Sequence, residues 1–269
     1  KAALFFLKNR SLMKILRFKI DPAILLDSSP DRRQFSMLVS EISTGPVFKT
    51  TGFERHNASD DVLVDYIKKF PGKPVLADIG VSDGTSALYL LQKLQINQIN
   101  AQVSLYDKYT RLNLLLKWPL RVYTNVDNEI VYIKFFCFLF FVYPFKIVFK
   151  ETTGTIISFD NPILKKFRLK IDYFDIFNTK LRESAYFIKC ANILNPVYFS
   201  RTDIKLALKN IHANLKEGGY VFIIHNTNDI ESLLILKKDG NALVIDKQTG
   251  DDGLLEYLGV HNKTITISH

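Results

Sequence analysis

The segment Leu76–Ser86 combines two glycines and two carboxylates, a set of residues that suits ligand binding at a tight turn. Gly80 and Gly84 let the backbone turn sharply and allow a ligand to approach, because glycine has no Cβ. Asp78 and Asp83 would make the turn negatively charged. Two carboxylates repel a pyrophosphate and attract a ligand that carries an ammonium or a sulfonium group. The spacing Gly-x-x-x-Gly also differs from the Gly-x-Gly-x-x-Gly of dinucleotide sites.

A strand–turn–helix–strand unit is expected to position this turn. Pro74–Asp78 is a short apolar run that ends in an acid, as in a buried parallel strand. A helix is predicted over Thr85–Leu94, with its N-terminus presented to the turn. A second strand is predicted over Gln102–Tyr106, followed by Asp107. This βαβ order implies a parallel sheet.

The later part of the chain continues the same alternation of strands and helices. We therefore predict an α/β fold with a doubly wound, mostly parallel, seven-stranded sheet and an antiparallel strand at its late edge. The elements that support it are strands at Leu169–Phe174, Ala185–Cys190 and Tyr220–His225, a helix at Thr202–Leu215, and a terminal hairpin of Leu233–Leu236 with Ala242–Ile245.

One main domain, preceded by an N-terminal segment, is expected. Residues 1–59 form an N-terminal segment, and residues 60–269 form the main domain. A helix over Asp60–Phe70, with Ser59 as its N-cap, begins the main domain. The main domain contains a β-rich antiparallel insertion at about 118–165, because the residues there alternate around turn sequences. Its predicted strand pairs are Leu120–Thr124 with Glu129–Lys134 and Ile147–Lys150 with Thr155–Ser158.

The pattern Asp78-x-Gly80-x-x-x-Gly84 resembles motif I of class I, Rossmann-like S-adenosylmethionine-dependent methyltransferases, with Ser82 in place of the central glycine. In that family an acid after the second strand binds the two ribose hydroxyls, and Asp107 matches it. A carboxylate can accept both hydrogen bonds.

Two further landmarks extend the resemblance. Asp175 matches the acid that contacts the adenine amino group, and Leu215–Tyr220 resembles the Leu-x-Pro-Gly-Gly turn before the fifth strand. The resemblance implies S-adenosylmethionine as the cofactor. The residues it implies for cofactor binding are Asp78, Gly80, Ser82, Asp83, Gly84, Asp107, Asp175 and Asn192.

The loop after the fourth parallel strand allows two alignments. Asn195–Tyr198 is similar to the Asn-Pro-Pro-Tyr motif of enzymes that methylate amino groups, with Val197 in place of the second proline. Alternatively, Ala191–Leu194 and Tyr198-Phe199 resemble the loop of chemotaxis-receptor-type methyltransferases, in which Asn192 would contact the methionine end of the cofactor. We favour the second alignment as a guide to structure, although it does not identify a substrate.

No catalytic residue is assigned from the sequence. Methyl transfer requires chiefly that nucleophile, methyl carbon and sulfur be aligned, and a base is needed only when the acceptor must lose a proton. His56 and His225 are the candidate bases, and Asn192 and Tyr198 are further candidates. For each histidine, a role as a surface or structural residue is favoured over a role as a base.

The chemical class of the acceptor also stays open. The net charge is +9, but basic residues occur along the whole chain, so a solvated basic surface is favoured over a nucleic-acid-binding face. A small molecule or a protein side chain is the expected acceptor. The alternatives are a nucleic-acid N-methyltransferase and a non-catalytic module that binds S-adenosylmethionine. The oligomeric state is left open.

The cysteines and the apolar segments indicate the cellular location of the protein. Cys137 and Cys190 lie in apolar segments without metal-ligand spacing, so we expect buried thiols, no metal site and a cytoplasmic location. Basic residues interrupt Ala2–Ile20 too often for a membrane span. Phe135–Phe149 is too short to span a bilayer, and it can be core, lid or a peripheral membrane contact.

Overall fold

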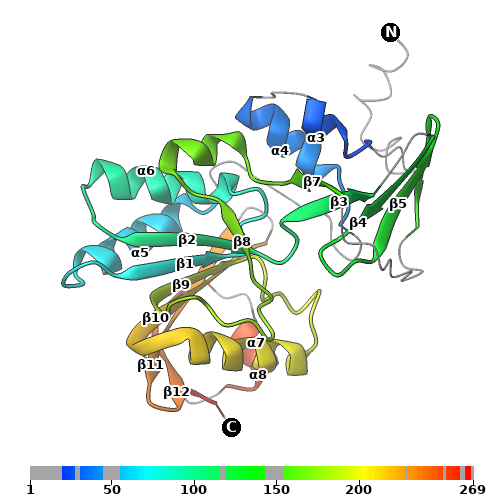
Figure 1. Ribbon diagram of the computed structural model, residues 1–269. Helices are drawn as coiled ribbons and strands as arrows, with labels where there is room; N and C mark the ends of the chain where they lie inside the picture. The colour runs from blue at the N-terminus through cyan, green and yellow to red at the C-terminus, as the bar shows by residue number, and fades with distance from the viewer. Residues whose placement is uncertain are drawn as a thin grey trace. The chain divides into compact units, whose positions relative to one another are not determined.

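The computed structural model divides into two compact units (Figure 1). The first unit combines Lys1–Thr50 with Arg111–Phe159, and the second combines Thr51–Thr110 with Asp160–His269. All candidate site residues belong to the second unit. The structure describes residues 20–27, 31–44, 55–115, 119–142, 154–227, 230–250, 253–260 and 264–267.

An eight-stranded sheet forms the centre of the second unit, in the order β13-β12-β11-β10-β9-β1-β2-β8. The five strands from β10 to β8 are parallel, and the direction of winding changes between β1 and β9. The strands are β1 (Val75–Ile79), β2 (Gln102–Asp107), β8 (Ile171–Tyr173), β9 (Ala185–Ala191), β10 (Leu215–Thr227), β11 (Ile230–Asp239), β12 (Ala242–Thr249) and β13 (Thr264–Thr266).

This sheet confirms the predicted doubly wound, mostly parallel architecture. Its late edge is larger than expected, because β11, β12 and β13 are all antiparallel to their neighbours. The described sheet therefore has eight strands where seven were predicted. Only two residues separate β10 from β11, and a parallel crossover needs a dozen or more, so these two strands pair as a hairpin.

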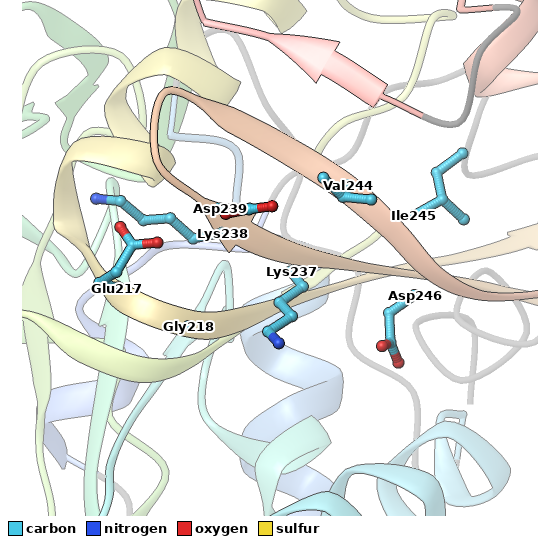
Figure 2. Close-up of a pocket in the computed structure, with 8 residues that line it drawn as sticks. All are labelled: Glu217, Gly218, Lys237, Lys238, Asp239, Val244, Ile245 and Asp246. Atoms are coloured by element: carbon cyan, nitrogen blue, oxygen red, sulfur yellow. The ribbon is translucent and has the colours of Figure 1, made fainter.

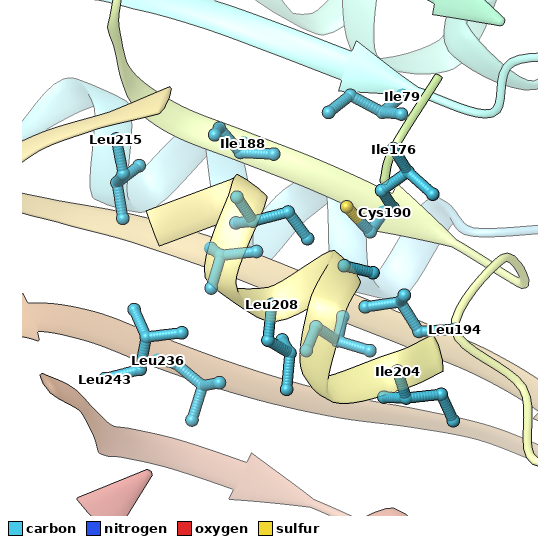
Figure 3. Packing of buried hydrophobic residues seen from close by; sticks show 14 of the residues in the cluster. Ile79, Ile176, Ile188, Cys190, Leu194, Ile204, Leu208, Leu215, Leu236 and Leu243 are labelled. Carbon is cyan, nitrogen blue, oxygen red and sulfur yellow. The ribbon is translucent and has the colours of Figure 1, made fainter. Parts of the chain in front are cut away.

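Helices cover both faces of this sheet. On one face, α5 (Asn57–Lys68) and α6 (Leu88–Ile96) pack against alternate residues of β1, β9 and β10. On the other face lie α7 (Arg201–Asn214) and α8 (Leu254–Leu258). Figure 3 shows α7 residues such as Leu208 packed over the apolar side chains of the strands. This burial on both faces explains why β1 is apolar along its whole length up to its acid.

Two helix starts differ from the sequence prediction. α5 begins at Asn57, and His56, not Ser59, is the N-cap. The backbone N–H of Ser59 and its hydroxyl donate to Glu231 Oε1 instead, at 2.8 and 2.6 Å. The helix predicted over Thr85–Leu94 begins as a 3-10 turn, η1 (Thr85–Ala87), and continues as α6.

The first unit has a five-stranded antiparallel sheet in the order β6-β5-β4-β3-β7. The predicted pairing of residues 120–124 with residues 129–134 is confirmed. β7 pairs with β3, and the predicted strand Ile147–Lys150 lies outside the described residues. The elements are α3 (Ile24–Asp27), α4 (Arg32–Ser40), β3 (Arg111–Leu115), β4 (Leu120–Thr124), β5 (Ile130–Phe135), β6 (Phe138–Phe141) and β7 (Thr155–Ser158).

The first unit has its own core, built from segments far apart in the sequence. Phe35 and Val39 of α4 pack with Leu112, Tyr123 and other buried residues of the sheet. The N-terminal residues and the insertion therefore share one core. Of the two cysteines expected to be buried, only Cys190 is; Cys137, between β5 and β6, is exposed.

Candidate cofactor site

The predicted glycine turn follows β1 and folds over the end of β2. Gly80, Ser82 and Gly84 all have positive φ, at 81°, 59° and 85°. The backbone N–H groups of Gly80 and Val81 donate to the carbonyl oxygen of Tyr106, at 2.8 and 3.2 Å. The turn is thereby held next to the acid that ends β2.

Asp107 presents its carboxylate at this turn. Its Oδ2 accepts the backbone N–H of Ser82 and its Oδ1 accepts that of Tyr109, each at 2.8 Å. The side chain is half-buried. The structure therefore brings together two residues predicted for one ligand, Ser82 and Asp107.

The room left by the two glycines is filled by the protein itself. A Cβ on Gly80 would overlap Cγ2 of Ile193, and a Cβ on Gly84 would lie 2.6 Å from Cδ1 of Leu164. We had expected these glycines to admit a ligand. In this structure they admit neighbouring side chains, so the turn packs tightly against the loop after β9.

Asp83 is fully buried inside the turn. Its carboxylate accepts the backbone N–H of Thr85 at 3.0 Å, the Thr85 hydroxyl at 2.9 Å and the side-chain amide of Asn161 at 3.2 Å. Asn161 also donates its backbone N–H to the carbonyl oxygen of Asp83, at 2.9 Å, and is the N-cap of η2 (Pro162–Phe167). These contacts argue against the predicted cofactor contact of Asp83, which instead joins the turn to η2.

Asp78 is buried in an ion-pair cluster that the sequence analysis did not anticipate. Lys189 lies opposite it on β9, with Nζ 3.3 Å from Asp78 Oδ2 and 2.7 Å from Asp60 Oδ1 on α5. All three side chains are almost completely buried. Burial raises the pKa of Asp78, and it raises the pKa of Asp60 to about 6, although the charge of Lys189 opposes both shifts. The two carboxylates raise the pKa of Lys189 despite its burial.

The turn therefore does not carry the exposed negative charge that its two acids predicted. Asp78 and Asp83 both face the protein interior, so neither presents a free negative charge to a ligand at the turn. Lys189 could have been found from the sequence, because it is the single charge within the apolar strand Ala185–Cys190. A charge in a buried strand needs a partner.

Asp175, predicted to contact adenine, lies beyond β8 and is mostly buried. Its Oδ2 forms an ion pair with Nζ of Lys108 at 2.8 Å, and its Oδ1 accepts the backbone N–H of Phe177 at 3.1 Å. Lys108 directly follows Asp107 in the chain. The two acids that the resemblance assigns to ribose and adenine are thus linked through this lysine.

Asn192 lies at the carboxyl end of β9, with φ of 57°. Its Oδ1 accepts the backbone N–H of Asn226, and its own N–H donates to Ile224, both at 2.8 Å. The side chain of Asn226 donates to the carbonyl oxygen of Arg55, at 3.1 Å. Asn192 therefore belongs to a polar link between β9, β10 and the residues before α5.

The remaining catalytic candidates lie in three different environments. His56 is buried, with Nδ1 3.5 Å from Oε2 of Glu231. Burial raises the pKa of Glu231, but hydrogen bonds from His56 and Ser59 outweigh this effect and lower it. His225 is buried within β10, whereas Tyr198 is 74% exposed, after a turn in which Val197 N–H donates to Asn195 Oδ1. These contacts assign none of the three a catalytic role.

An open cavity of about 350 Å³ lies at the opposite end of the sheet (Figure 2). It is lined by the start of β10, the end of β11 and part of β12. Two of its charged side chains have protein partners: Lys238 donates to the carbonyl oxygens of His212 and Leu215, and Glu217 accepts from the backbone N–H of Gly240. This cavity is separate from the glycine turn, which follows the carboxyl end of β1.

The parallel strands occur in the order third, second, first, fourth, fifth, and the glycine turn lies where the winding reverses. Ligands of doubly wound sheets bind at this switch point. The order and the turn define a doubly wound, Rossmann-like α/β fold. No protein-family model matches the sequence, and no curated protein matches it.

Several solved structures match at low identity. The CurJ carbon methyltransferase is 17% identical, over 84% of this chain and 48% of that chain, with a TM-score of 0.45. A S-adenosylmethionine-dependent methyltransferase from Clostridium acetobutylicum is 12% identical, over 78% and 80%, with a TM-score of 0.39. The citrinin polyketide synthase CMeT domain is 12% identical, over 63% and 34%, with a TM-score of 0.38. This chain spans less than half the length of the first and the third. Because all three TM-scores are below 0.5, the fold assignment rests on the strand order.

Proposed function

We propose that this protein is a S-adenosylmethionine-dependent methyltransferase acting on a small molecule or a protein side chain. One observation carries the proposal: the carboxylate of Asp107 is held beside the Gly80–Gly84 turn, at the switch point of the sheet, by the backbone N–H groups of Ser82 and Tyr109. The free cysteines Cys137 and Cys190 support a reducing compartment such as the cytoplasm.

The proposed site consists of predicted residues that lie at the carboxyl ends of the parallel strands. Asp107 would accept the ribose hydroxyls, and Asp175, held by Lys108, would lie near the adenine. Asn192 would contact the methionine end. Bound S-adenosylmethionine would supply an activated methyl group, and the protein would align the acceptor with it. Asp78 would support the site indirectly, through its buried ion pair with Lys189. The turn residues Gly80, Ser82 and Gly84 would shape the site through their backbone conformation.

A second candidate is a module that binds S-adenosylmethionine without catalysis. The burial of both His56 and His225 favours it, since neither histidine is presented to solvent as a base. Catalysis of a reaction in which the acceptor has no proton to lose needs no such base. The two candidates agree on the cofactor and differ only in turnover.

Calorimetric titration with S-adenosylmethionine, and with NAD for comparison, tests the proposal. We expect binding of S-adenosylmethionine and none of NAD. Asp107→Ala should weaken binding by about 1–3 kcal/mol, roughly 5- to 150-fold, because charge-assisted hydrogen bonds are lost. Asp239→Ala, which removes an exposed acid at the end of β11, is the matched control and should bind like the unmodified protein. Binding of NAD alone, or a folded Asp107→Ala protein with unchanged affinity, would contradict the proposal.

A further inference from the structure

The loop after β8 fixes the position of Asp175 through its own backbone. The N–H of Asp175 donates to Oγ1 of Thr179 at 3.0 Å, and its carbonyl oxygen accepts the N–H of Thr179 at 2.9 Å. Its Oδ1 accepts the N–H of Phe177 at 3.1 Å. One carboxylate oxygen is thus bound within the loop, and these contacts hold Asp175 in place without help from another strand.

The other carboxylate oxygen, Oδ2, is bound by Lys108, with Nζ at 2.8 Å. Lys108 directly follows Asp107, the last residue of β2. β2 and β8 are neighbours in the sheet, and the backbone N–H of Phe174 donates to the carbonyl oxygen of Asp107 at 3.1 Å. The lysine therefore follows one acid of the proposed site in the chain and contacts the other through space.

The two members of this ion pair differ in exposure. The side chain of Asp175 is 8% exposed, whereas that of Lys108 is 33% exposed. A buried carboxylate needs a partner. A lysine on a flexible stem can move its ammonium group into water. The pair therefore consists of a fixed acid and a cation that is able to leave it.

An adenine amino group would need the same oxygen. Oδ1 is bound by Phe177, and Asp175 is too deeply buried to offer much other surface to a ligand. Hydrogen bonds between two ions are stronger than those in which one partner is neutral. The neutral amino group therefore competes with the Lys108 ammonium for Oδ2, and the exchange lowers the affinity for an adenosine ligand.

We propose that Lys108 determines cofactor affinity by occupying the adenine position of the site, so that the adenosine ligand must displace it from Asp175. The inference rests on the proposed function, which assigns Asp175 to the adenine of S-adenosylmethionine. If Lys108 served instead to hold Asp175 in place for adenine, its removal would weaken binding. The two roles thus predict opposite signs.

Calorimetric titration of Lys108→Met with two ligands tests the proposal. S-adenosylhomocysteine carries the adenine amino group, and S-inosylhomocysteine has an oxygen in its place. Lys108→Met should bind S-adenosylhomocysteine roughly 3- to 10-fold more tightly than the unmodified protein does, since a competing ion pair is removed. It should bind S-inosylhomocysteine no more tightly. Lys170→Met, which removes an exposed lysine paired with Asp172 of β8 at 3.1 Å, is the matched control and should bind both ligands like the unmodified protein.

Circular dichroism shows whether Lys108→Met is folded, and Lys108→Gln replaces it if it is not. Unchanged or weaker binding of S-adenosylhomocysteine by the folded variant would overturn the proposal. An equal gain for both ligands would also overturn it, because the effect would not involve the amino group. If neither the unmodified protein nor the variant binds S-adenosylhomocysteine, the proposed function itself fails. Binding by Lys108→Met alone would support both the cofactor site and its occupation by the lysine.

Discussion

At the scale of single residues, the glycine turn shows how a motif can be placed correctly while its contacts differ from expectation. Gly80 and Gly84 have the positive φ that the turn requires. Their missing Cβ atoms make room for Ile193 and Leu164. A glycine in such a motif therefore has two separate roles, one in backbone conformation and one in close packing.

Gly80→Ala separates these two roles. The left-handed conformation costs an L-residue about 1–2 kcal/mol, and overpacking against Ile193 adds about 1–3 kcal/mol. Gly72→Ala is the matched control, because Gly72 has φ of 86° but nothing within 4 Å of the added Cβ. Urea unfolding should show a larger loss of the free energy of unfolding for Gly80→Ala. Equal losses would mean that the contact with Ile193 does not restrict position 80.

At the scale of elements, the buried cluster joins three of them: Asp60 of α5, Asp78 of β1 and Lys189 of β9. These positions lie beside the apolar core that α5 shares with the sheet. Removing the lysine leaves two buried carboxylates without a cation. Breaking a buried ion pair in this way costs far more than removing an exposed one.

We predict that Lys189→Met lowers the free energy of unfolding by about 3–5 kcal/mol at neutral pH. Asp60→Asn should cost much less, because it leaves Lys189 paired with Asp78. Chemical denaturation of the two variants, beside the unmodified protein, measures the difference. A Lys189→Met protein as stable as the Asp60→Asn protein would show that the cluster does not hold these elements together.

The same cluster predicts a pH dependence. The pKa of Asp60 is about 6 in the folded protein, against 3.8 for the model carboxyl, so the folded state binds this proton more tightly than the unfolded state. The contribution of Asp60 to stability is therefore greatest below the unfolded value and falls as the pH rises from about 4 to about 6. Asp60→Asn should reduce this decline when denaturation is followed across that range. If the loss of stability between pH 4 and pH 6 is the same in Asp60→Asn, it arises from other groups.

At the scale of the whole molecule, the chain forms two compact units, each with its own sheet and core. The first unit is discontinuous in sequence, because it combines Lys1–Thr50 with Arg111–Phe159. Residues of α4 and residues of the insertion lie far apart in the chain, and the core that they share joins them in one unit. Among the helices that the structure describes, none is long and apolar enough to cross a membrane.

The sequence by itself determined much of the second unit. The apolar run before Asp78, the glycine spacing and the acid after the second strand predicted the βαβ unit, and the structure has it at those positions. Ser82 and Asp107, which the resemblance assigns to one cofactor site, are hydrogen-bonded to each other. These features depend on residues close together in the chain, where backbone conformation and side-chain alternation are set by local chemistry.

Tertiary structure alone decided which acids face inward and which apolar residues face outward. Asp78 pairs with Lys189, 111 positions later in the chain, and Lys189 also pairs with Asp60 of α5. Asp83 accepts a hydrogen bond from Asn161, which follows the insertion. Likewise, the chain from Phe135 to Phe141 has a composition suited to a core, yet α3 and α4 cover only one face of its sheet. Burial and charge pairing depend on partners far away in the sequence, so a local pattern leaves them undetermined.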